Sequence, residues 1–140
     1  MLFSASDLLF LNSLKSQNPK LKVLVSLRFD RKAVANLISA NSSRSIDETD
    51  SAYSRLAIRV RDFIVAHEID GVDLDSKYLT DNEILSVNKE IVTSFTKALR
   101  YAFQERNSVN IKPKEFLISI TSSKYPKELA DDYNFKEIKK

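Results

Sequence analysis

Three short apolar runs, separated by long stretches of helical character, constrain the fold of this sequence more than any other feature. The runs are LKVLVSL at residues 21–27, DGVDL at 70–74 and EFLISI at 115–120. Their length and weak alternation predict strands buried on both faces. The connections between them are long enough for parallel crossovers, so the sequence predicts an α/β fold with a parallel sheet. We expect the strands to lie adjacent in chain order.

The connecting segments carry apolar residues at helical spacing. Helices are predicted over residues 7–16, 31–40, 50–67 and 82–105, with Ser6 and Thr49 as the N-caps of the first and third. Residues 41–49 are polar and predict a loop that contains a glycosylation sequon at Asn41, and residues 122–140 form a polar tail. A chain of 140 residues without internal repeats fits one domain.

Composition excludes several classes of protein. A chain of this length with only 1 Gly cannot carry a dinucleotide fingerprint or a Walker loop. Without Cys and with 1 His, it offers no disulfide scaffold and no thiolate or His-rich metal site, and we expect no cofactor. The 22 basic and 19 acidic residues are interspersed, which favours a solvated surface over a nucleic-acid interface. No stretch approaches the ~18 apolar residues of a membrane span, and the N-terminus is a poor signal peptide.

The segment DGVDLDSKY, which begins at Asp70, is the most informative for chemistry. Alternate residues of a strand share a face, so Asp73, Asp75 and Lys77 are predicted to point to one side. Lys77 is then within reach of an ion pair with one of the aspartates. Parallel α/β folds place their sites at this carboxyl end of the strands. The alternative is a charged strand end at which Lys77 only neutralises the two acids.

DGVDLDSKY resembles the signature of glycoside hydrolase family 18, the chitinases and chitinase-like lectins, which reads D-G-x-D-x-D-x-E and is often followed by Tyr. The stretch LKSQNPKLKVLVSL at residues 14–27 is similar to a second family segment, and FLISITSS at 116–123 falls where a further strand belongs. The resemblance covers nearly the whole chain. It implies a partial (β/α)8 TIM barrel over residues 1–140 whose three strands match the third to fifth units. It also implies chitin or N-acetylglucosamine oligomers as ligands and an extracellular location.

The departures from the family pattern predict a loss of catalysis. The resemblance places the Glu that protonates the glycosidic oxygen at Lys77, and an ammonium with a pKa near ~10.4 is a poor general acid. It gives Asp75 the role of orienting the substrate's acetamido group, and makes Tyr78 and Phe29 candidate substrate contacts. Phe29 is otherwise a core or gap-filling aromatic. Arg28 and Phe29 replace two expected glycines, and Glu68 replaces another.

Length is a further departure, because a complete eightfold barrel takes ~250 residues. We therefore expect a fragment, a truncated gene model or a degenerate copy of the family. The sequence predicts a catalytically inactive, truncated chitinase-like domain that retains weak chitin binding or none. Two alternatives remain open: a divergent chitinase within a longer gene product, and an interaction protein that uses open sheet edges.

Overall fold

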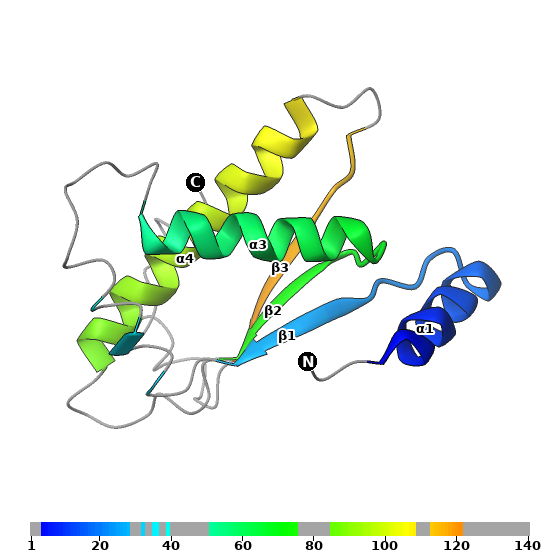
Figure 1. The fold of residues 1–140 in the computed structure, drawn as a ribbon, viewed down its shortest axis with the longest axis horizontal. Coiled ribbons are helices and arrows are strands. Elements are labelled where there is room, and N and C mark those ends of the chain that lie inside the picture. The colour runs from blue at the N-terminus through cyan, green and yellow to red at the C-terminus, as the bar shows by residue number, and fades with distance from the viewer. Residues whose placement is uncertain are drawn as a thin grey trace.

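The computed structural model describes residues 4–28, 32, 35–36, 39, 51–75, 85–108 and 113–121. Their helices and strands alternate along the chain (Figure 1). The elements are α1 (Ala5–Gln17), β1 (Leu24–Arg28), α3 (Ala52–Ala66), β2 (Gly71–Asp75), α4 (Leu85–Ser108) and β3 (Leu117–Thr121). Most of the predicted helix at 31–40, the loop at 41–49 and the tail at 122–140 lie outside the described residues.

The three strands form one parallel sheet in the order β1-β2-β3, which confirms the predicted adjacency and direction. The register pairs Val25 with Val72 and Val72 with Ile118, so that each strand's apolar residues fall in common rows. The strands begin one to three residues later than their apolar runs. In all three runs the first residues lead into the sheet rather than pair within it.

The hydrophobic core lies between one face of this sheet and the helices α3 and α4. Val25, Val72 and Leu74 share that face because they alternate along their strands. The helices contribute apolar residues at helical spacing: Ala57, Val60 and Ile64 from α3, and Val92, Phe95, Leu99 and Phe103 from α4. The predicted burial of the strands on both faces is wrong for β1, because Ser26 and Arg28 alternate with its apolar residues and are exposed. It is also wrong for β3, whose residues are half-buried up to Ile120 and exposed at Thr121.

The two helix starts differ from the predicted caps. Ser4, not Ser6, caps α1: its side chain accepts a hydrogen bond from the backbone N–H of Asp7, whose carboxylate accepts one from the N–H of Ser4. This reciprocal arrangement satisfies two backbone N–H groups, those of Ser4 and Asp7, whereas a serine cap alone would satisfy only one. Ser51, rather than Thr49, caps α3 and accepts from the N–H of Ser54. At the start of α1, the hydrogen bonds that the backbone N–H and the hydroxyl of Ser4 donate to the Asp7 carboxylate lower the pKa of that carboxyl.

The end of α3 sets the direction in which the chain enters β2. The N–H of Glu68 donates to the carbonyl of Val65, and the N–H of Ile69 donates to that of Ile64. This is the Schellman pattern, which requires a left-handed residue just after the helix. Glu68 takes that conformation with φ 56°, at the position where the sequence resemblance expects glycine. Ile64 and Ile69 are both buried, so the turn is closed by apolar packing as well.

The only glycine of the sequence is required by close approach of two strands. A Cβ at Gly71 would lie 2.0 Å from the carbonyl oxygen of Leu117, at the start of β3. Real Cβ atoms do not approach a backbone oxygen so closely, so only glycine fits this point of the sheet. None of the helices in the described ranges is long and apolar enough to cross a membrane.

Candidate functional site

The sheet face opposite the core is polar and carries two acids of the motif, Asp73 and Asp75. The register sets two rows of side chains across the three strands. Ser26, Asp73 and Ser119 form one row, and Arg28, Asp75 and Thr121 form the next row toward the carboxyl ends. The prediction that Asp73 and Asp75 share one face, with Val72 and Leu74 on the other, is confirmed.

Asp73 is the centre of a cluster of hydroxyl groups contributed by both neighbouring strands. Its Oδ1 accepts hydrogen bonds from Ser119 Oγ at 2.6 Å and from Thr121 Oγ1 at 3.0 Å. Its Oδ2 lies 3.0 Å from the same threonine oxygen and accepts from Ser26 Oγ at 3.3 Å. A half-buried carboxylate with donors on both sides is held in one orientation. These hydroxyl partners on β1 and β3 follow from the register, which the sequence alone did not give.

Asp75 has a cationic neighbour from the adjacent strand. Arg28 Nε lies 3.8 Å from Asp75 Oδ2, and the arginine side chain is 62% exposed against 17% for the aspartate. The sequence analysis noted Arg28 only as the replacement of an expected glycine and did not predict the ion pair. The signal was present in the register, because Arg28 is the direct partner of Asp75 on β1.

Asp70 belongs to a different site from Asp73 and Asp75. It precedes β2 at the amino end of the sheet, whereas Asp73 lies in the middle of β2 and Asp75 at its carboxyl end. Its side chain is 6% exposed and forms ion pairs with Lys15 at 2.9 Å and Lys114 at 3.3 Å. The three acids of the motif are therefore spread from the amino end to the carboxyl end of one strand. Sequence reasoning missed both lysines, because they are far from Asp70 in the chain.

Three candidate residues cannot be placed. Lys77, Tyr78 and Phe29 lie outside the described residues, so the ion pair predicted for Lys77 stays a prediction. Among the residues that the structure does describe, no group of three or more His, Cys, Asp or Glu side chains could hold a metal ion.

The arrangement so far defines a class of protein: parallel strands joined by helices, with acidic side chains on the sheet face opposite the core, an α/β arrangement of the kind found in (β/α)8 barrels. The chain matches the family model described as Glycosyl hydrolases family 18 over residues 4–140, and it belongs to that family. A search of curated proteins found no match to the chain. The parallel α/β architecture is consistent with part of a TIM barrel of this family.

Proposed function

We propose that this chain is a non-catalytic, chitinase-like domain that binds N-acetylglucosamine oligomers weakly and does not hydrolyse them. The observation that carries the proposal is the residue at position 77. The family motif ends in a carboxylic acid that protonates the leaving oxygen, and the chain has Lys77 there. Loss of a general acid alone typically costs about 10²–10⁴ in rate.

The contact between Arg28 and Asp75 supports the same proposal from a second direction. In the substrate-assisted scheme of this family, the aspartate two residues before the acid orients the acetamido group that attacks the anomeric carbon. Here Arg28 Nε lies 3.8 Å from Asp75 Oδ2. The guanidinium would therefore compete with the acetamido group of a substrate for this carboxylate. Two cationic side chains therefore stand at positions where the family pattern has a glycine and an acid.

The surface that supports weak binding is the polar sheet face opposite the core. Ser26, Ser119 and Thr121 present hydroxyl groups around Asp73, and neutral sugars are bound through such hydroxyl and carboxylate groups. These hydroxyls are already engaged with Asp73, so a sugar must share or displace bonds that exist in the free protein. Affinity gained in this way is small.

The test combines hydrolysis and binding in the full chain. We expect no turnover of a chromogenic chitobiose substrate, and we expect Lys77→Glu alone to remain inactive because Arg28 still neutralises Asp75. Titration with N-acetylglucosamine oligomers, followed by NMR, should show weak binding that Asp75→Ala reduces. Turnover by the unmodified chain that Asp75→Ala abolishes would refute the proposal and favour a divergent chitinase. Absence of any oligomer binding at millimolar concentration would refute the binding part.

A further inference from the structure

Helix α1 is joined to the rest of the structure differently from the other helices. Helices α3 and α4 pack on each other and on the sheet, and they supply most of the core. From α1, Leu8 is the residue that packs against this core, while Leu9 and Phe10 are 71% and 62% exposed. Figure 1 shows α1 beyond the amino end of β1, apart from the other two helices. Leu8, Leu11 and Leu14 of α1 are half-buried and none is fully buried, so apolar burial holds α1 less firmly than it holds α3 and α4.

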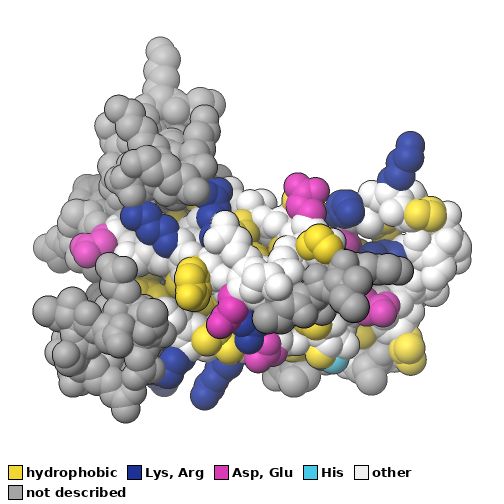
Figure 2. All heavy atoms as spheres, turned by 90° about the horizontal axis from the view of Figure 1, so that it is seen from above, with side chains coloured by type: hydrophobic (Ala, Val, Ile, Leu, Met, Phe, Trp, Pro, Cys, Tyr) yellow, Lys and Arg dark blue, Asp and Glu magenta, His cyan; other side chains and the backbone are white. Residues whose placement is uncertain are grey.

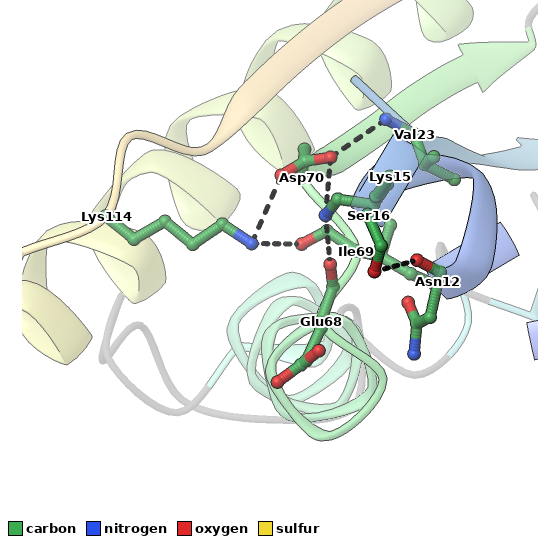
Figure 3. A network of polar contacts seen from close by, with 8 residues as sticks. All are labelled: Asn12, Lys15, Ser16, Val23, Glu68, Ile69, Asp70 and Lys114. Atoms are coloured by element: carbon green, nitrogen blue, oxygen red, sulfur yellow. Dashed lines mark hydrogen bonds and ion pairs between the residues drawn. The ribbon is translucent and has the colours of Figure 1, made fainter. Parts of the chain in front are cut away.

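The polar contact of α1 with the sheet is concentrated in its last turn. Lys15 Nζ lies 2.9 Å from Asp70 Oδ2 and donates to the carbonyl of Glu68 at 2.6 Å (Figure 3). Both partners lie on the chain between α3 and β2, and Lys15 is only 23% exposed. Glu68, whose carbonyl Lys15 contacts, is the left-handed residue just after α3. Lys15 thus joins α1 to the amino end of β2.

Asp70 has further partners that do not involve α1. Its Oδ2 accepts a hydrogen bond from the N–H of Val23 at 2.9 Å. On the other side, Lys114 Nζ lies 3.3 Å from Oδ1 and donates to the carbonyl of Ile69 at 2.9 Å. Asp70 therefore connects the segments that enter β1 and β3 as well as α1. If Lys15 leaves, the buried carboxylate still has one ammonium and one backbone donor.

We propose that the Lys15–Asp70 contact is a latch, through which α1 docks on the sheet and detaches while the sheet, α3 and α4 stay folded. The asymmetry of the Asp70 partners supports this order of events. Loss of Lys15 removes the polar attachment of α1 but leaves Val23 and Lys114 to hold the junction of the strands. Detachment uncovers the part of the core that Leu8 covers, and it leaves the packing of α3 on α4 intact.

The test is hydrogen–deuterium exchange of the full chain, read separately in peptides from residues 5–17 and 91–103. In Lys15→Met, which keeps the apolar stem, we expect α1 to exchange at least about tenfold faster, the change that ~1.4 kcal/mol produces. Residues 91–103 should stay as protected as in the unmodified chain. Lys15→Arg, which retains the charge, should restore the protection of α1.

Two matched variants separate the latch from a general loss of charge. Lys20→Met removes an exposed lysine from the segment after α1 and should leave exchange unchanged. Lys114→Met removes the other ammonium beside Asp70 and should spare α1 while it loosens the entry to β3. Unchanged protection of α1 in Lys15→Met would overturn the proposal. Equal loss of protection in both peptides would also overturn it, because α1 would then unfold only together with the core.

Discussion

Replacement of the only glycine, Gly71→Ala, gives the sharpest test of the described sheet. The added Cβ would lie 2.0 Å from the oxygen, 2.7 Å from the carbon and 2.8 Å from the nitrogen of Leu117. All three are backbone atoms, so no side-chain rotation can relieve the clash. The start of β3 must move away from β2 by about 1.5 Å or more to reach ordinary contact distance.

The cost of this movement follows from the contacts that it breaks. The N–H of Leu117 donates to the carbonyl of Asp70 at 2.9 Å, and its loss costs about 1 kcal/mol. The Lys114 contacts with Asp70 and Ile69 belong to the same junction and contribute about 1–3 kcal/mol more. Alanine regains about 0.4–1 kcal/mol by restricting the unfolded chain. The net loss in the free energy of unfolding is about 1–3.6 kcal/mol, with a middle value of about 2 kcal/mol.

Urea unfolding followed by circular dichroism measures this loss. With a slope of about 1–3 kcal/mol/M, the middle value of the loss lowers the midpoint by roughly 1 M. Glu115→Ala, an exposed change two residues before β3, is the matched control and should leave the midpoint within error. A midpoint for Gly71→Ala equal to that of the unmodified chain would show that β3 does not pair with β2 in this register.

Two further predictions concern the turn before β2 and the carboxylate beside it. Glu68→Gly should raise the free energy of unfolding by about 0.5–1 kcal/mol, because glycine takes the left-handed conformation without strain; an unchanged or lower urea midpoint would contradict this. Burial raises the pKa of Asp70, but the N–H of Val23 and the ammonium groups of Lys15 and Lys114 outweigh it, so the folded-state pKa lies below the ordinary value of 3.8. The stability that Asp70 contributes is therefore present above the unfolded-state pKa and lost as pH falls through the folded-state pKa. Thermal melting from pH 6 to pH 2 should fall less steeply in Asp70→Asn, and parallel curves would refute the assignment.

The sheet could be predicted from the sequence because its signals are local. Short apolar runs between helical segments fix the strands, their direction and their order without knowledge of any contact. The strand bounds moved by only a few residues, and alternation correctly put Asp73 and Asp75 on one face. The caps were misplaced because each helix start offers two hydroxyl residues two positions apart, Ser4 and Ser6 or Thr49 and Ser51, and only the bond geometry selects Ser4 and Ser51.

The partners of the acids could not be predicted because they are long-range contacts. Lys15 and Lys114 meet at Asp70 from opposite ends of the described chain, and neither carries a sequence signal that separates it from the other lysines. In the sequence, Arg28 stood out only as a replacement of an expected glycine. The register shows that it lies beside Asp75. Basic and acidic side chains lie interspersed on the face shown in Figure 2, so charge clustering does not point to these pairs either.

The three acids of the motif serve different physical purposes, and this bears on what the proposed loss of catalysis would change. Asp70 connects α1, β1 and β3 at the amino end, and Asp73 orders hydroxyl groups from β1 and β3 in the middle of the sheet. Removal of either carboxylate would leave buried or half-buried donors unsatisfied, with or without a substrate. Asp75 is the acid whose family role depends on the residue at position 77. A chain with Lys77 can therefore keep the acidic motif for the stability of its sheet, and the presence of these aspartates is not in itself evidence of hydrolysis.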